Sequence, residues 1–430
     1  MDAVTLILLA ASLILFFGFF AEWFFRKFNV PDVLFLIILG FIIGPNALNY
    51  VTPADLVSIA PVFTTFTLVF LLFDGAFNIR LSSLIKEFSE SFVLTLFNFF
   101  ISTIIVTLLM LTFGYSFMVA LLTGFLLGGV SSSFVIPLLK QMRISERLYA
   151  LLSLESALTD VFCIVFSLTV IEVFSLGGFG IRETLTQIAS LFAVAGLVGL
   201  IGGIIWIILI LKVFKEHNYI MVIAYLLLIY VLTEFLGGNG AIAALFFGLI
   251  LNNSKQLSSI IKGILSKKKT EKKKALAGEL GESVTTHSEQ YFYHQISFFL
   301  KTFFFVYIGI MLDISDWKAL VIGILISFLL MGSRMASLLL TRHKMDHDHR
   351  SLVNAIFARG LAAAAIAGLA IEKGFPNAQF IAEIAYVVIT GTIILSSIKV
   401  FIIKRRLPSN EEEETPKKVH HHKKKTKKKK

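Results

Sequence analysis

Cysteine and charged residues are scarce in this chain. Cys163 is the single cysteine among 430 residues, and charged residues make up only 16% of the sequence. One thiol cannot build a disulfide framework or supply a Cys-x-x-Cys metal pair. Hydrophobic residues make up 57%, with 43 phenylalanines among them, whereas a soluble domain has about 45–50% apolar residues. The composition therefore excludes an ordinary soluble domain and a disulfide-rich scaffold.

The apolar residues fall in runs long enough to cross a membrane. Each run has about 20 residues, which as a helix spans a hydrocarbon core of ~30 Å. The runs are unbroken rather than alternating, which excludes a transmembrane barrel. The first run follows Asp2 and is too long for a signal peptide, so we expect no cleavable signal. The sequence predicts an all-α polytopic membrane protein.

We predict thirteen membrane spans, of which the ninth is short. They lie at residues 3–24, 31–50, 56–78, 91–113, 116–139, 148–174, 187–212, 217–235, 238–253, 291–312, 317–340, 350–371 and 378–402.

The basic residues predict the topology. Loops that follow odd-numbered spans are rich in lysine and arginine, whereas loops after even spans hold only Arg182, Lys318 and Lys373. Basic loops stay in the cytoplasm, so we expect the N-terminus outside and the C-terminus inside. The net charge of +11 therefore reflects membrane topology and not a nucleic-acid partner. The polar loop 254–290 and the basic tail 404–430 are expected in the cytoplasm, the tail histidines being solvated.

Weak helix centres recur seven spans apart. Span five contains Gly128, Gly129 and Ser131–Ser133, and span twelve contains Arg359-Gly360 followed by an alanine run. Because seven is odd, the two spans run in opposite directions. Inverted repeats with one broken helix in each half are typical of transporters, whose ion site lies at the breaks. Small residues also serve ordinary helix contacts.

Two acids lie deep in the sixth span. Glu155 and Asp160 are five residues apart and therefore point to different sides of a helix. An ionised carboxylate in mid-membrane costs about 2.5 kcal/mol or more, so each needs a cation, a proton or a polar cavity. Arg334 or Arg359, also deep, could neutralise Glu155. Asp160 would then be left, beside Thr159, to bind either a proton or a small cation.

These residues resemble a family. The chain is similar to microbial monovalent cation/proton antiporters, such as the Na⁺/H⁺ exchangers, of the electroneutral-type branch of the cation:proton antiporter superfamily. The branch carries Glu-Ser-x-x-Asn-Asp on its sixth span, and Glu155, Ser156 and Asp160 match it, with Thr159 in place of Asn.

Three further motifs match in order. LLFDGA around Asp74 corresponds to an LLFEGG-like third span, and Arg334 corresponds to a basic residue on span eleven. Arg359-Gly360 corresponds to the Arg-Gly that opens the family's broken twelfth helix.

The resemblance implies an NhaA-type fold with two inverted repeats and crossed discontinuous helices 5 and 12. Residues 1–90 and 187–312 would form a dimerisation domain, and 91–174 and 317–403 a core domain. It further implies a homodimer in the plasma membrane.

In the implied mechanism, Asp160 is the shared carrier of cation and proton. Thr159, Ser156 and one of Ser131 or Ser132 would supply neutral oxygens, and Asp74 would contribute from the other domain. The core ion pair of Glu155 with Arg334 or Arg359 would be structural.

Two departures bear on ion choice. Span five has VSSSF where many electroneutral members have Thr-Asp-Pro, which is closer to the Ser-Ser-Thr of the potassium/proton branch. Electrogenic relatives carry a second Asp where this chain has Thr159, so the resemblance implies one cation per proton. Exchange of Na⁺ or Li⁺ is expected, and K⁺ stays an alternative.

Rival classes lack their signatures. A cation channel would need a carbonyl filter such as TVGYG, and an intramembrane hydrolase would need paired acids or a Ser/His arrangement. Neither pattern is present in the spans, so we expect no enzyme and no cofactor, with only the transported ions bound.

Overall fold

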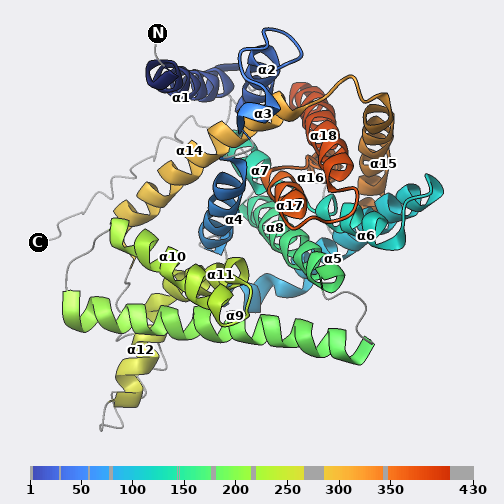
Figure 1. The fold of residues 1–430 in the computed structure, drawn as a ribbon. Helices are drawn as coiled ribbons and strands as arrows, with labels where there is room; N and C mark the ends of the chain where they lie inside the picture. Colours follow the sequence, from blue (N-terminus) through green and yellow to red (C-terminus); the bar gives the residue numbers. More distant parts are fainter. Residues whose placement is uncertain are drawn as a thin grey trace, which may run out of the picture.

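The computed structural model is a bundle of helices (Figure 1). It describes residues 3–28, 31–56, 59–76, 81–142, 144, 146–175, 181–214, 219–265, 285–341 and 347–406. Every regular element in these ranges is a helix. The tail 404–430 expected in the cytoplasm lies mostly outside the described residues.

The helices follow one another in this order: α1 (Ala3–Phe28), α2 (Asp32–Ile43), α3 (Pro53–Leu56), α4 (Ala60–Ala76), α5 (Leu81–Thr112), α6 (Phe117–Leu126), α7 (Ser132–Gln141), α8 (Glu146–Ser175), α9 (Ile181–Leu209) with its π-helical end η1 (Ile210–Phe214), α10 (Tyr219–Phe235), α11 (Gly240–Asn252), α12 (Ser254–Leu265), α14 (His287–Met311), α15 (Trp317–Thr341), α16 (His347–Ala355), α17 (Leu361–Glu372) and α18 (Ala378–Arg406).

The helices are those of a multi-pass membrane protein. Among the described residues, six helices are long and apolar enough to cross a membrane, namely α5, α8, α9, α14, α15 and α18. Shorter apolar segments of 10–17 residues lie in α1, α2, α4, α6, α10, α11 and α17.

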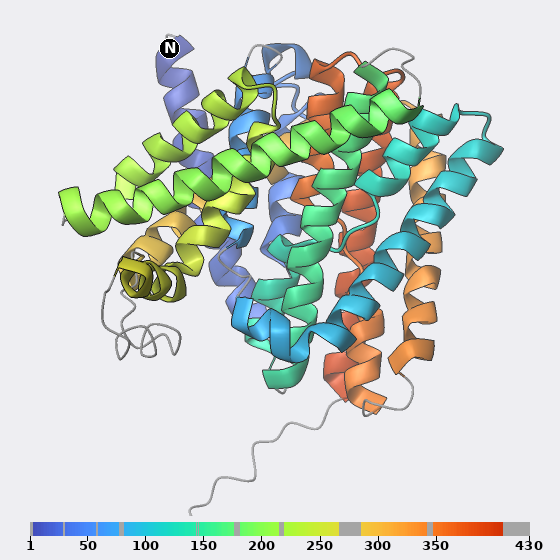
Figure 2. The ribbon, with the colours of Figure 1, turned by 90° about the horizontal axis from the view of Figure 1, so that it is seen from below.

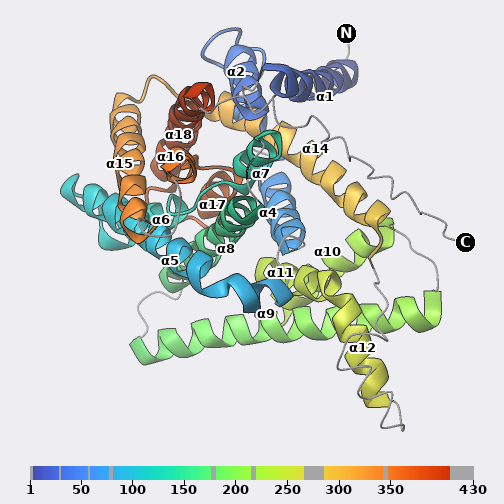
Figure 3. The ribbon, with the colours of Figure 1, turned by 180° about the vertical axis from the view of Figure 1, so that it is seen from behind.

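The helices gather in two groups (Figures 1 and 3). In the first group α5, α6 and α8 pack on one another and α15 packs on α5 and α18, with α7, α16 and α17 completing it. In the second, α14 packs on α2, and α11 packs on α4, α9 and α10. The largest contact between the groups is that of α4 with α17.

Two expected spans are each split into two helices. The span expected at 116–139 is divided between α6, which ends at Leu126, and α7, which begins at Ser132. The span expected at 350–371 is divided between α16, ending at Ala355, and α17, beginning at Leu361. The two extended segments meet, because the Ser131 N–H donates to the Ala358 carbonyl over 2.8 Å.

Gly360 makes the close approach of the two breaks possible. A Cβ atom at this position would lie 1.9 Å from the Ser131 Oγ, a distance that no side chain tolerates. The glycine is therefore required by the crossing itself, since any other residue would push the two extended segments apart.

The second helix is shorter than expected. The span predicted at 31–50 is helical only from Asp32 to Ile43. Gly44, in extended backbone, precedes Pro45, and a residue before proline is disfavoured in the helical region. The chain then turns over residues 45–50, where Asn49 adopts a positive φ of 53°.

The helices α2 and α14 approach each other closely at paired glycines. A Cβ at Gly40 would lie 2.0 Å from the Val306 carbonyl oxygen, and one at Gly309 would lie 2.2 Å from the Ile37 carbonyl oxygen. Such small residues let membrane helices pack backbone to backbone, which strengthens dispersion contacts where lipid supplies no hydrophobic driving force.

An ion pair links the same two helices. Lys301 of α14 donates to the Asp32 carboxylate of α2 over 2.6 Å, and both side chains are largely buried. Lys301 lies in the middle of α14. Neither member of this pair was predicted from the sequence.

We predict that Gly309→Ala lowers the thermal stability of the detergent-solubilised protein. The added methyl overlaps the Ile37 carbonyl, and forced overpacking costs about 1–3 kcal/mol. The shift in melting temperature is measured by heating samples and quantifying the remaining folded protein by size-exclusion chromatography. Gly332→Ala is the control, since a Cβ there meets no atom within 4 Å. Equal melting temperatures for the two variants would contradict the packing argument.

Candidate ion-binding site

Asp160 lies at the start of the half-helix α7. Its Oδ2 accepts a hydrogen bond from the Ser132 backbone N–H over 3.1 Å and another from the Ser132 hydroxyl. Ser132 is the first residue of α7. The first N–H groups of a helix have no partner within it, and the positive end of the helix dipole favours an anion there. The carboxylate of α8 thus caps α7 from a neighbouring helix.

Three residues of α8 hold the break between α6 and α7. The Gly129 N–H donates to the Cys163 Sγ over 3.0 Å, and the Val130 N–H donates to the Thr159 Oγ1 over 3.0 Å. The Ser131 N–H donates to the Ala358 carbonyl, which lies between α16 and α17, and the Ser132 N–H donates to the Asp160 carboxylate. Every backbone N–H from 129 to 132 therefore has a partner, as buried backbone requires.

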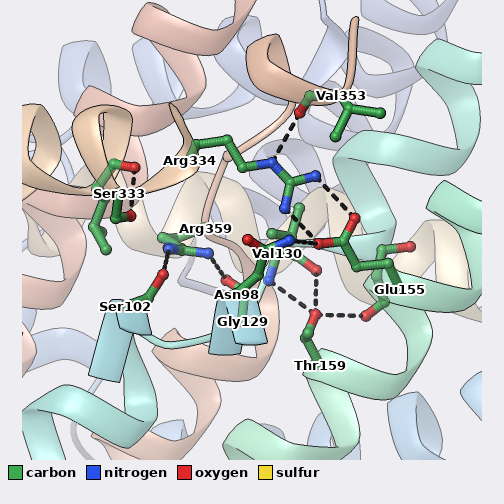
Figure 4. A network of polar contacts seen from close by, with 12 residues as sticks. Asn98, Ser102, Gly129, Val130, Glu155, Thr159, Ser333, Arg334, Val353 and Arg359 are labelled. Carbon is green, nitrogen blue, oxygen red and sulfur yellow. Dashed lines mark hydrogen bonds and ion pairs between the residues drawn. The ribbon is translucent and has the colours of Figure 1, made fainter. Parts of the chain in front are cut away.

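Thr159 binds the backbone of the segment between α6 and α7. None of its described hydrogen bonds goes to Asp160. Its hydroxyl lies 3.2 Å from the Ser156 carbonyl and 3.3 Å from the Val130 carbonyl, and its single proton can go to either (Figure 4). The buried Ser156 hydroxyl donates to the Ser153 carbonyl over 3.0 Å. Of the serines expected beside Asp160, the structure brings Ser132 to it, and Ser131 lies against Gly360.

Glu155 pairs with Arg334 and not with Arg359. The pair is bidentate, with the Arg334 Nη2 at 2.8 Å from the Glu155 Oε2 and Nη1 bound to Oε1 (Figure 4). Asn98 of α5 adds a hydrogen bond to Oε1 over 2.7 Å, and the Arg334 Nε donates to the Val353 carbonyl over 2.8 Å. Glu155 and Arg334 are 1% and 3% exposed, so each charge depends on the other for compensation.

Arg359 binds the carbonyl end of the break. Its Nη1 donates to the Gly129 carbonyl and its Nη2 to the Ser102 hydroxyl, the latter over 3.1 Å (Figure 4). The carbonyl lies just beyond the end of α6, where the helix dipole is negative. The two half-helix ends thus face opposite charges, Arg359 at the end of α6 and Asp160 at the start of α7.

Asp74 lies on α4 and faces α14. Its Oδ2 accepts a hydrogen bond from the Ser297 hydroxyl over 2.7 Å, and its Oδ1 lies 3.3 Å from the His294 Nδ1. Asp74 is largely buried and His294 is about half exposed. The described contacts of Asp74 are thus with the second group, and its contribution to a site at Asp160 stays a prediction.

Four contributors to these networks were not predicted from the sequence: Asn98, Ser102, Ser297 and His294. Asn98 and Ser102 lie one turn apart on α5, so they present polar groups on one side of an apolar helix. That spacing was a usable signal. Ser297 and His294 gave none, because their contact with Asp74 spans more than 200 residues of sequence.

Comparison with known proteins identifies the family. The sequence profile described as "Sodium/hydrogen exchanger, transmembrane" matches residues 12–405. The chain belongs to the sodium/hydrogen exchanger family. The resemblance to cation/proton antiporters expected from the sixth-span motif is confirmed at the level of the family.

Relatives of this exchanger-family chain include transporters of two cations. It is 31% identical over 237 residues to the Na⁺/H⁺ antiporter ApNhaP of Aphanothece halophytica, covering 54% of this chain and 43% of that protein. It is 25% identical over 232 residues to the K⁺/H⁺ antiporter NhaP2 of Shewanella oneidensis, covering 53% and 40%. The matches thus span about two fifths of these relatives' lengths.

The fold matches a solved exchanger structure. The sodium proton antiporter MjNhaP1 of Methanocaldococcus jannaschii aligns with a TM-score of 0.70 at 20% identity, covering 92% of this chain and 100% of that chain. At this identity the likeness concerns the fold alone.

We predict that Glu155→Gln and Arg334→Gln each lower thermal stability, because each leaves one buried charge without its partner. Breaking a buried pair costs about 3–5 kcal/mol. The double variant removes both charges, so its loss should be smaller than the sum of the single losses. Melting temperatures of the four proteins in one detergent test this. Additive losses would contradict the ion pair.

Proposed function

We propose that the chain is a secondary active antiporter that exchanges Na⁺ or Li⁺ for H⁺, one for one, with Asp160 as the shared carrier. The observation that carries the proposal is the position of Asp160 at the crossing of two broken helices, where its described hydrogen bonds come from the neutral Ser132. Membership of the exchanger family and the printed activities of the relatives support it.

The proposal includes an NhaA-type fold of thirteen spans, each broken helix being counted once. The first group of helices corresponds to the core domain (91–174 and 317–403), and the second to the dimerisation domain (1–90 and 187–312). A homodimer in the plasma membrane, with the N-terminus outside, completes it. The segregation of packing into two groups supports this division.

The proposed exchange follows from the charge on one carboxylate. An empty, ionised Asp160 would resist movement past an apolar barrier, whereas loading with either a proton or a cation neutralises it. The neighbouring Glu155 is already occupied by the bidentate contact with Arg334, so loading is assigned to Asp160. Only one acid of the sixth span therefore loads, and each half-cycle carries one positive charge. The cycle is therefore expected to be electroneutral.

The proposed movement is an elevator-type shift of the core domain along α4 and α14. On the core side, α17 contains the alanine run Ala362–Ala365 and Gly368. At Gly368 an added Cβ would lie 3.0 Å from the Thr64 Cγ2 of α4, so the two helices are close there. Tyr386 of α18 packs edge-to-face on Tyr307 of α14, with ring centroids 6.3 Å apart. Small side chains on α17 leave few ridges to obstruct such sliding.

The neutral oxygen ligands around Asp160 would determine which cation is selected. Ser132 is the first proposed ligand, joined by Ser131, Ser156 or Thr159 after small rotations, with Asp74 contributing from the dimerisation domain. The three serines at the break and the K⁺/H⁺ antiporter relative favour K⁺/H⁺ exchange as a second candidate. A cation channel is the alternative from another class, and its conductance would exceed carrier rates.

We predict that Asp160→Asn abolishes exchange and leaves the protein folded. Asparagine retains an oxygen that accepts the hydrogen bonds of Ser132. It can neither bind the proton nor neutralise the positive charge of the cation. Proton flux in proteoliposomes, followed by dequenching of a pH-sensitive dye, measures the loss. Asp313→Asn, in the exposed loop after α14, is the matched control and should transport normally. Transport by Asp160→Asn at the wild-type rate would overturn the assignment.

We predict that Na⁺ and Li⁺, added in turn to such vesicles, drive proton flux at submaximal concentrations where K⁺ does not. The flux should be unchanged by an imposed membrane potential, since no net charge moves in a one-to-one cycle. A K⁺ response as large as that to Na⁺ would favour the second candidate. Stimulation by voltage would contradict the one-to-one stoichiometry.

A further inference from the structure

A small polar cavity lies inside the first group of helices. Its polar lining comes from α5, from α15 and from the segment between α16 and α17, and consists of Asn98, Ser102, Ser333, Arg334 and Arg359, all of them buried. The helices α5 and α15 pack side by side at the right of Figure 2, and Figure 4 shows the polar lining residues. The space open to the centre of a water molecule is about 10 Å³, which is room for one water.

Arg359 brings an unpaired donor to this cavity. Its two terminal nitrogens bind the Gly129 carbonyl and the Ser102 hydroxyl, whereas its buried Nε has no hydrogen-bond partner among the described residues. A buried N–H without an acceptor is destabilising, and the more so on a charged group. The Nε–H of Arg359 therefore needs an acceptor that the described part of the chain does not supply.

Asn98 brings an unpaired acceptor to the same cavity. Its Nδ2 donates to the Glu155 Oε1 over 2.7 Å, and its buried Oδ1 has no partner in the described ranges. This contact fixes the orientation of the amide, because the opposite orientation would place two acceptors together at the carboxylate. Asn98 and Arg359 are 4% and 2% exposed, so bulk water satisfies neither atom.

The chemistry of the two unpaired atoms defines the ligand. A halide could accept from the Arg359 Nε–H, but it would meet the lone pairs of the Asn98 Oδ1. A metal cation would meet the Nε–H. A water molecule can accept from Arg359 and donate to Asn98, and a buried water makes about three hydrogen bonds. The Ser102 and Ser333 hydroxyls, on the same lining, are further partners for it.

We propose that this cavity binds one ordered water molecule, which accepts a hydrogen bond from the Arg359 Nε and donates one to the Asn98 Oδ1. The water would join two networks that the described side-chain hydrogen bonds leave separate. In one, Arg359 holds the Gly129 carbonyl at the break between α6 and α7. In the other, Asn98 binds the pair of Glu155 and Arg334. The inference depends on packing and hydrogen bonding and does not require the proposed exchange.

Structure determination of the protein in nanodiscs, at a resolution that shows ordered water, tests the site directly. We expect one density peak within about 2.7–3.2 Å of both the Arg359 Nε and the Asn98 Oδ1. A cavity without density, in a map that shows water elsewhere in the protein interior, would overturn the proposal. So would a peak that contacts Arg359 and Arg334 but not the Asn98 Oδ1, since a bound anion takes that position.

Hydroxyl-radical footprinting is a second test. Radiolysis of a bound water oxidises the side chains beside it, and Phe357 is a fully buried ring on the lining. We expect Phe357 to be oxidised several times faster than Phe247, which is equally buried and outside the lining. Val130→Ile adds a methyl group to the lining and should remove more than half of that excess. Val135→Ile, at a buried valine outside the lining, should leave it unchanged. Equal oxidation of the two phenylalanines, or an undiminished excess in folded Val130→Ile, would contradict the site.

Discussion

The structure depends on satisfying a stretch of extended backbone inside the membrane. Residues 127–131 lie between the helices α6 and α7, so the N–H groups of 129–132 have no partner within a helix. Each of them would cost several kcal/mol if left unsatisfied inside the membrane. Thr159, Asp160 and Cys163 of α8 and the Ala358 carbonyl supply the partners. This requirement fixes α8 against the break, and it brings an ionisable carboxylate to the positive end of a half-helix. The candidate site is thus a consequence of how the broken backbone is stabilised.

The two acids of α8 differ because their surroundings differ. Glu155 is enclosed by Arg334 and Asn98 and accepts three hydrogen bonds, two of them from a guanidinium. It has nowhere to accept a further cation without losing that pair. Asp160 is held by the hydroxyl and the backbone N–H of Ser132, which a proton or a cation can replace or join. The described hydrogen bonds of the Arg359 side chain go to the Gly129 carbonyl and the Ser102 hydroxyl and to neither acid.

The sequence predicted the membrane class, the sixth-span acids and the positions of both breaks, because each depends on local composition. Long apolar runs, glycines next to serines and charges deep in a span can each be recognised from a short stretch of sequence. The partners were less predictable. Arg334 and Arg359 were equally plausible for Glu155, and their distinction depends on the rotation of α15 and on the path of 356–360. The pair of Lys301 and Asp32 was not predicted, because the two residues are 269 positions apart and neither one indicates the other in the sequence.

The central claim is that one proton and one cation compete for Asp160. Calorimetric titration of Na⁺ into the purified protein, in two buffers of different ionisation enthalpy, counts protons released on binding. At a pH where Asp160 is protonated, the account predicts about one proton released per Na⁺ bound, and neither binding nor release in Asp160→Asn. Na⁺ binding without proton release, or unchanged release in the variant, would contradict it.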